Sequence, residues 1–89
     1  MHKEKSKIKV FDFFSGCGGT SEGLREAGMD IVLGLDNNKE ALKTFERNIK
    51  PECGTIPDDI TFVETTRIKN IVDKYRISGN RILFCGCAP

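Results

Sequence analysis

A cluster of glycines follows the first apolar segment of the chain and could bring the backbone close to a bound ligand. The β-rich run IKVFDFF at residues 8–14 leads directly into Ser15, Gly16, Cys17, Gly18 and Gly19. Glycines at a strand-to-helix turn allow close backbone approach, and amide hydrogens at a helix N-terminus favour an anionic group. Tight turning also needs glycines whatever binds, so a turn without a ligand is the alternative.

Two acids and one aromatic residue indicate which kind of ligand this cluster could bind. Asp36 ends the second apolar run, twenty residues after Gly16, which is the spacing at which a carboxylate accepts hydrogen bonds from ribose hydroxyls. Phe14 offers a face on which a purine can stack, and Glu64 could accept the amino edge of adenine. Together these residues predict a nucleoside pocket. Taken singly, Phe14 could be core, Asp36 a helix cap and Glu64 a solvated carboxylate.

The elements that must position these residues alternate regularly along the chain. The pattern predicts strands at 8–14, 30–36, 60–64 and 81–85, separated by helices at 20–28, 37–50 and 65–79, with a loop at 51–59. This β-α-β-α-β-α-β order forces parallel strands and right-handed crossovers. We therefore expect an α/β fold, the first half of a doubly wound Rossmann-like sheet in strand order 3-2-1-4, with the fourth strand as an exposed edge.

The helices also show expected starts and buried faces. Thr20 or Ser21 is the predicted N-cap of the first helix, and Asn37 with Glu40 has capping-box spacing at the second. The predicted buried faces have helical spacing and comprise Ala41, Leu42, Phe45 and Ile49 in the second helix and Ile68, Ile71, Val72 and Tyr75 in the third.

Composition narrows the class of protein. The 89 residues allow one small domain, and 38% hydrophobic with 30% charged residues is typical of a soluble globular chain without a membrane span. Fourteen basic and thirteen acidic residues give a net charge of +1, so bulk charge does not indicate a nucleic-acid partner. Residues 1–7 are expected to be a flexible tail, and the lysines at alternate positions up to Lys9 a solvated approach to the first strand; a phosphate-contacting arm is the other interpretation.

The cysteines do not suggest a metal or a disulfide scaffold. Cys85 and Cys87 are two apart rather than in a C-x-x-C pair, and His2 is the only histidine. Reduced thiols in a cytoplasmic protein are therefore expected. A nucleotide-dependent oxidoreductase is disfavoured because Ser21 stands where the dinucleotide fingerprint has its third glycine.

The segment DFFSGCGGTSEGLREAGMDIVLGLDNNKEALKTFERN resembles the opening of a cytosine-5 DNA methyltransferase. It has the family's F-x-G-x-G-G motif, the acid that ends the second strand, and the pattern A-x-x-T-F-x-x-N from Ala41 to Asn48. The final ILFCGCAP resembles the strand that leads into the family's Pro-Cys-Gln loop, so the match runs from about Val10 to Pro89.

The resemblance implies a site for S-adenosyl-L-methionine, with S-adenosylhomocysteine as product, in a partial methyltransferase domain at residues 8–89. It places Phe14 against the adenine, Asp36 on the ribose diol and Asn37 beside the adenine. The adenine amino group is assigned to Glu64 rather than to Asp59, because Asp59 precedes the predicted strand at 60–64. The full set of implied cofactor residues is Phe14, Ser15, Gly16, Cys17, Gly18, Gly19, Asp36, Asn37, Glu64, Thr65 and Pro89.

The resemblance also implies the chemistry of a longer parent protein. In the family, the residue after the loop proline is a cysteine whose thiolate adds to C6 of a flipped-out cytosine, so that C5 can accept the methyl group. The sequence reaches Pro89, and Cys85 and Cys87 are not matched to that nucleophile. We therefore expect these 89 residues to be inactive alone and to belong to a prokaryotic, cytoplasmic enzyme that meets double-stranded DNA through other parts. A non-catalytic cofactor-binding fragment, a split-enzyme subunit and an RNA substrate remain open.

Overall fold

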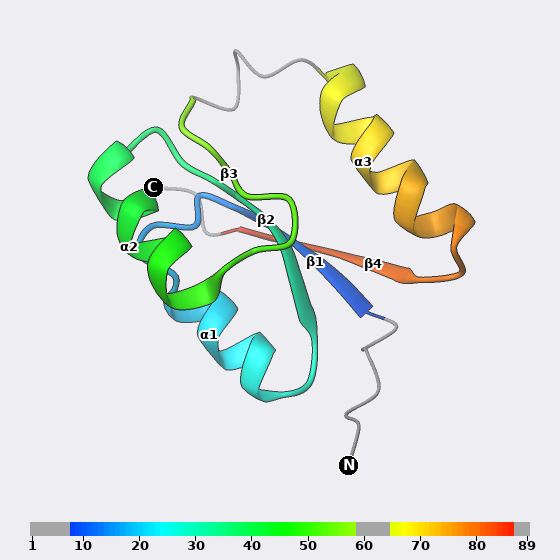
Figure 1. Ribbon diagram of the computed structural model, residues 1–89, viewed down its shortest axis with the longest axis horizontal. Helices are drawn as coiled ribbons and strands as arrows, with labels where there is room; N and C mark the ends of the chain where they lie inside the picture. Colours follow the sequence, from blue (N-terminus) through cyan, green and yellow to red (C-terminus); the bar gives the residue numbers. More distant parts are fainter. Residues whose placement is uncertain (1–7, 59–64, 87–89) are drawn as a thin grey trace.

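Four parallel strands form the centre of the protein (Figure 1). The computed structural model describes residues 8–58 and 65–86. Within them, the strands are β1 (Ile8–Phe13), β2 (Asp30–Leu35), β3 (Thr55–Ile56) and β4 (Arg81–Gly86), and the sheet has the order β3-β2-β1-β4. All three pairings are parallel. The expected fold class and strand order are confirmed.

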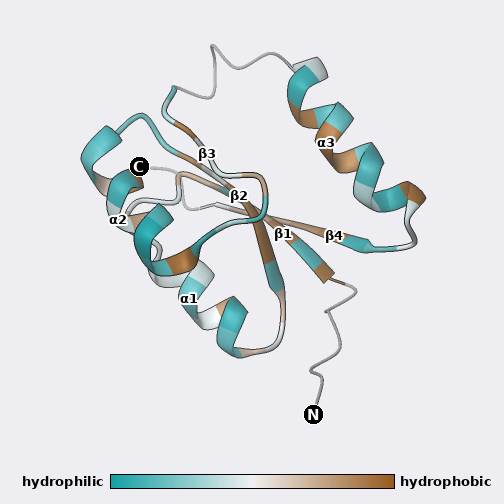
Figure 2. Cartoon of the chain, in the orientation of Figure 1, coloured by the Kyte–Doolittle hydropathy of each residue, from teal (hydrophilic) through white to brown (hydrophobic). Residues whose placement is uncertain are grey.

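Helices cover both faces of this sheet. Helices α1 (Gly19–Glu26) and α2 (Lys39–Ile49) lie on one face, and α3 (Thr65–Ile77) lies on the other (Figure 1). Neighbouring residues of β1 alternate between the two faces, as strand geometry requires: Val10 packs with α2 residues such as Phe45, and Phe11 packs with Val72 of α3. In Figure 2 the strands carry much of the apolar sequence and the helices are largely hydrophilic.

The third strand differs from the prediction. Thr55 and Ile56 pair with Gly34 and Leu35 of β2, within the segment that was expected to be a loop. The predicted strand at 60–64 lies outside the described residues. A pairing of two residues has no measurable periodicity, and only Ile56 is a fully buried apolar residue there. The consequence for the site is that the carboxyl end of β3 comes after Ile56.

Strand β4 is the exposed edge that the sequence predicted. Among the described strands it pairs only with β1, and its Phe84 side chain is 54% exposed. The Phe84 ring stacks on Phe13 with centroids 5.6 Å apart and also contacts Phe11 at 5.7 Å. These contacts hold β4 to β1 near the strand end that leads into the glycine turn.

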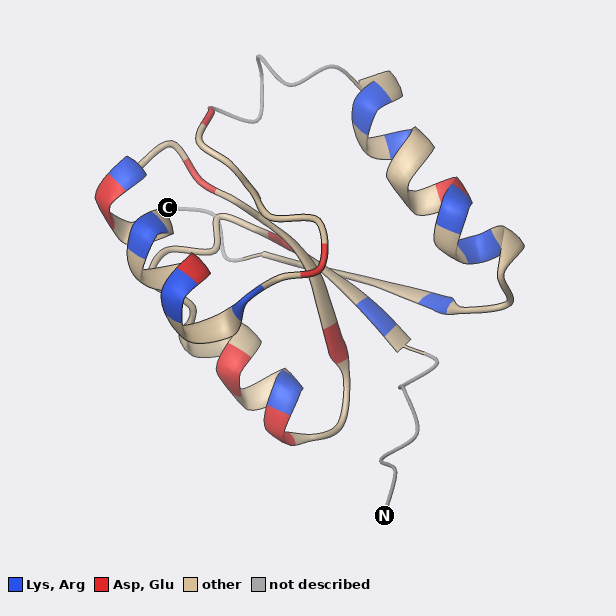
Figure 3. Ribbon diagram, in the orientation of Figure 1, with Lys and Arg blue, Asp and Glu red and all other residues tan. Residues whose placement is uncertain are grey.

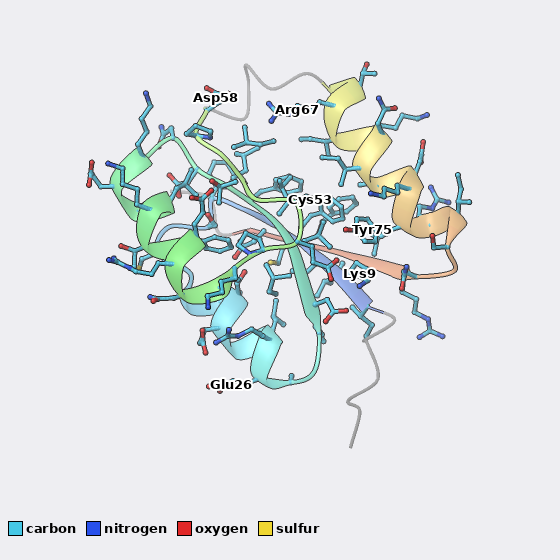
Figure 4. The ribbon with its side chains drawn as sticks, viewed as in Figure 1. Lys9, Glu26, Cys53, Asp58, Arg67 and Tyr75 are labelled. Carbon is cyan, nitrogen blue, oxygen red and sulfur yellow. The ribbon has the colours of Figure 1, made fainter. Side chains whose placement is uncertain are left out.

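Lys9 is buried, which corrects its interpretation as part of a solvated segment. Its Nζ lies 2.7 Å from Asp30 Oδ2 and 3.4 Å from Glu52, and it lies over the Tyr75 ring at 5.4 Å. Cys53 Sγ is 3.4 Å from the Tyr75 hydroxyl, so the segment between α2 and β3 also contacts α3 at this group (Figure 4). Most other charged residues lie on the three helices (Figure 3). No helix among the described residues has the length and hydropathy of a membrane span.

Candidate functional site: a glycine turn joined to Asp36

The chain leaves β1 through a turn that uses left-handed backbone conformations. Phe14, Gly16 and Gly18 have φ angles of 60°, 55° and 103°. Gly18 is the N-cap of α1 and provides no side-chain cap, so Thr20 and Ser21 do not cap this helix as predicted. Helix geometry leaves the first amides of α1 without intrahelical acceptors. The turn therefore presents amide hydrogens at the carboxyl edge of the sheet.

Asp36 points to this turn. Its Oδ2 accepts a hydrogen bond from the Gly16 amide at 2.8 Å, and its Oδ1 accepts one from the Asn38 amide at 2.9 Å. The Ser15 amide also donates to the Leu35 carbonyl at 3.0 Å. The ends of β1 and β2 are thus connected by backbone and carboxylate together, and Asp36 holds both the turn and the approach to α2.

The cap of α2 is Asn38 and not Asn37. The Asn38 side chain accepts from the Ala41 amide at 3.1 Å. Asn37 is exposed beside Asp36 at the same edge. The predicted N-cap was therefore wrong by one residue, and Asn38 forms no capping box because Ala41 stands three residues after it. The carboxylate of Asp36 fixes the amide of Asn38 and so sets where the helix begins.

Phe14 is half-buried and belongs to neither hydrophobic core cluster. The alternative that it is a core residue is therefore not supported. A positive φ is uncommon for a residue with a bulky side chain, and such residues concentrate at functional sites. Phe14 is held in this conformation between the end of β1 and the Asp36-bonded glycine.

Ser15 has a buried hydroxyl that finds no hydrogen-bond partner within the described residues. Such groups usually have one, because leaving a buried donor unsatisfied costs free energy. Gly16 and Gly19 have open space where a Cβ would lie, whereas a Cβ on Gly18 would come within 3.0 Å of Phe45. The turn is thus closed against α2 and open near Gly16 and Gly19.

Sequence reasoning missed the carboxylate of Asp12. This β1 residue is 3% exposed, and its Oδ2 accepts a 2.5 Å hydrogen bond from Ser21, which is fully buried. Burial raises the pKa of the Asp12 carboxyl, against the effect of hydrogen bonds from Ser21 and Cys85. The signal was present as an acid inside an apolar strand, a position that charged residues rarely occupy without a partner.

Comparison with known proteins decides the family. The model of the family described as C-5 cytosine-specific DNA methylase matches residues 8–78. The chain belongs to this family.

Relatives of the methylase family match at moderate identity. Type II methyltransferase M.Eco47II of Escherichia coli is 36% identical over 64 residues, covering 72% of this chain and 15% of that protein. Type II methyltransferase M.HgiGI of Herpetosiphon aurantiacus is 44% identical over 41 residues, covering 46% of this chain and 32% of that protein. The chain thus spans a third or less of these relatives.

The fold agrees with a solved structure. A prophage-encoded E. coli protein, assigned as a DNA modification methyltransferase, superposes with a TM-score of 0.66 and 26% identity, covering 76% of this chain and 19% of that one.

The remaining residues implied by the methylase resemblance lie in different places. Glu64 and Pro89 are outside the described residues, as is Asp59. Thr65 is the exposed first residue of α3. Asp58 is the first acid after β3, since that strand ends at Ile56. The preference for Glu64 over Asp59 stays a prediction, since both residues and the predicted strand at 60–64 lie outside the described residues.

The thiols of the described residues show no metal or disulfide arrangement. Cys17, Cys53 and Cys85 are free, and no group of three potential ligands gathers within 8–58 and 65–86. Burial, followed by the charge of Asp12, raises the pKa of Cys85 to about 12. Because the thiolate is the nucleophile, the raised pKa disfavours Cys85 as a nucleophile.

Proposed function

We propose that this chain is the cofactor-binding part of a DNA cytosine-5 methyltransferase, which transfers a methyl group from S-adenosyl-L-methionine to C5 of cytosine in double-stranded DNA. The observation that supports this most is the hydrogen bond from the Gly16 amide to Asp36 at 2.8 Å. It brings the two halves of a nucleoside site, which are far apart in the sequence, to one edge of the sheet.

Asp36 retains capacity to bind a ribose. A carboxylate offers about four lone-pair positions, and the amides of Gly16 and Asn38 account for two of them. The remaining positions can accept hydrogen bonds from two vicinal hydroxyls. The two amide donors also fix the plane of the carboxylate, so that it is oriented before a ligand arrives.

The turn supplies the other contacts. The Phe14 ring stacks on the adenine, and the backbone of residues 15–19 surrounds the methionine portion, with the amides at the start of α1 facing its carboxylate. The unpartnered hydroxyl of Ser15 fits a site that a polar ligand completes. S-adenosyl-L-methionine supplies the methyl group as part of a sulfonium and leaves as S-adenosylhomocysteine.

The reaction needs a nucleophile, and we assign none among the residues described. We therefore expect the chain to bind cofactor without transferring methyl groups to DNA on its own, and to act as part of a longer enzyme that resembles the type II methyltransferases of restriction-modification systems. Cytoplasmic location stays a prediction.

A ligand comparison tests this proposal. S-adenosylhomocysteine and NAD are each added at millimolar concentration to the 15N-labelled chain, so that weak binding is still visible in amide spectra. We expect S-adenosylhomocysteine to shift the amides of Gly16 and Gly19, and NAD to leave them unchanged. Equal or larger shifts with NAD would favour a nucleotide-dependent oxidoreductase, and no shift with either would refute a cofactor site.

A further inference from the structure

The Asp12–Ser21 hydrogen bond connects the two ends of the glycine turn. Asp12 precedes Phe14 by two residues and Ser21 follows Gly19 by two, so their 2.5 Å bond joins the two sides of the turn. Asp12 lies on the face of β1 that α1 and α2 cover, next to Cys85 of β4. Every residue assigned to the turn lies between these two anchors.

Burial of the Asp12–Ser21 pair is expected to lower the stability of the fold. Asp12 and Ser21 are 3% and 0% exposed, and no Lys or Arg in the described part of the chain forms an ion pair with Asp12. The groups that act on its carboxyl are Ser21, the Cys85 thiol and the more distant charge of Asp36. A buried acid without a cationic partner is unfavourable for stability, and such groups concentrate at functional sites.

Helix packing alone does not require a serine here. The dinucleotide fingerprint places a glycine at this position so that the helix can approach the strand closely. Ser21 is fully buried, and its hydroxyl donates its hydrogen bond to Asp12. A glycine at this position would remove the hydroxyl that donates to the Asp12 carboxylate. The Asp12 and Ser21 side chains are therefore matched to each other.

We propose that Asp12 and Ser21 are positioning residues, which hold the glycine turn in the conformation that receives the cofactor. This inference rests on the proposed function. The pair sets the distance between the end of β1 and the first turn of α1, and thereby the left-handed conformations at Phe14, Gly16 and Gly18. Neither side chain needs to touch the ligand.

Amide hydrogen exchange tests the positioning without any ligand. The reporters are the Gly16 amide, which donates to Asp36, and the Gly18 amide, which donates to the Ser15 carbonyl at 3.1 Å. Ser21→Ala is expected to speed exchange at both amides by about tenfold, the equivalent of one strong hydrogen bond, and to leave β2 and α2 amides unchanged. The control is Thr20→Ala, an exposed neighbour in the same helix, which should change neither set.

Two further variants keep the test decisive if Ser21→Ala does not fold. Asp12→Asn retains an oxygen acceptor for Ser21 and should keep the turn protected. Asp12→Asn combined with Ser21→Ala removes the bond without leaving a buried unpaired carboxylate, and should again expose the turn amides. Uniformly faster exchange in β2, α2 and the turn would show a general stabilising role and overturn the proposal, as would unchanged exchange at Gly16 and Gly18.

Binding separates this inference from the proposed function. We expect S-adenosylhomocysteine affinity to fall by about tenfold in the variants that lose the bond and to be retained in Asp12→Asn. If the wild-type chain ignores S-adenosylhomocysteine, the proposed function fails, whereas the exchange result still decides whether the pair holds the turn. Faster exchange at the turn with undiminished affinity would refute positioning for the cofactor.

Discussion

Replacing Asp36 by asparagine removes one of the two acceptors that hold the edge of the site together. The amide oxygen can serve either the Gly16 or the Asn38 amide, which lie 2.8 and 2.9 Å from the carboxylate oxygens, and the other backbone amide then faces an NH₂ group. Hydrogen bonds to a charged group contribute about 1.5–3 kcal/mol, and because Asp36 is only half-buried we take the lower end, about 1.5 kcal/mol. For a chain of this size that lowers Tm by roughly 6–12 °C.

Circular dichroism melting of Asp36→Asn against wild type measures this change. The matched control is Glu40→Gln, an acid-to-amide change at an exposed residue whose ion pair with Lys43 spans 3.4 Å; it should leave Tm unchanged. Affinity for S-adenosylhomocysteine should fall as well, because the ribose acceptor is lost. An Asp36→Asn chain that melts with wild type would show that the carboxylate does not hold the turn.

Two further predictions concern the scaffold. Gly34→Ala places a Cβ 2.5 Å from the buried Phe45 ring and should destabilise the fold by about 1–3 kcal/mol. Gly23→Ala, in α1 with nothing within 4 Å of the added Cβ, should stabilise the fold by about 0.5–1 kcal/mol. Urea unfolding measures the free energy of unfolding of both variants, and a change of the same sign in both would contradict the packing. Burial alone would lower the pKa of Lys9, but the hydrogen bond to Asp30 and nearby carboxylate charges outweigh it, so the pKa is raised. The stability that comes from this raised pKa is present below the unfolded pKa near 10.5 and is lost as pH rises through the folded pKa. Lys9→Met should therefore be less stable than wild type at pH 8, and the difference in unfolding free energy should shrink under alkaline conditions. A difference that widens with pH would refute the ion pairing of Lys9.

The order of elements could be predicted because each long element has its own pattern. The apolar runs of β1, β2 and β4 and the helical spacing in α2 and α3 are local, and the alternation of strands and helices then fixes parallel pairing. Strand β3 at Thr55–Ile56 was missed because a strand of two residues has no such pattern, and the predicted strand at 60–64 lies outside the described residues. Its position depends on pairing with β2, which is a tertiary contact.

The site was predictable where backbone requirements select residue types. Glycines at positive φ and an acid at a strand end are recognisable from spacing, and the structure joins Gly16 to Asp36. Side-chain pairs are different, since their partners are known only once the elements pack. Ser21 was interpreted as a helix cap, Asp12 was not noticed and Lys9 was considered solvated, although each is buried with a specific partner.

The Phe45 ring lies against two glycines, Gly18 in the turn and Gly34 in β2. A Cβ at Gly18 would come within 3.0 Å of this ring, and a Cβ at Gly34 within 2.5 Å. Substitutions at these glycines would compete for the same space, so their effects should not add. Efforts to re-engineer this part of the protein should therefore vary Gly18, Gly34 and Phe45 together. A smaller side chain in place of Phe45 would make room for a larger residue at Gly18 or Gly34.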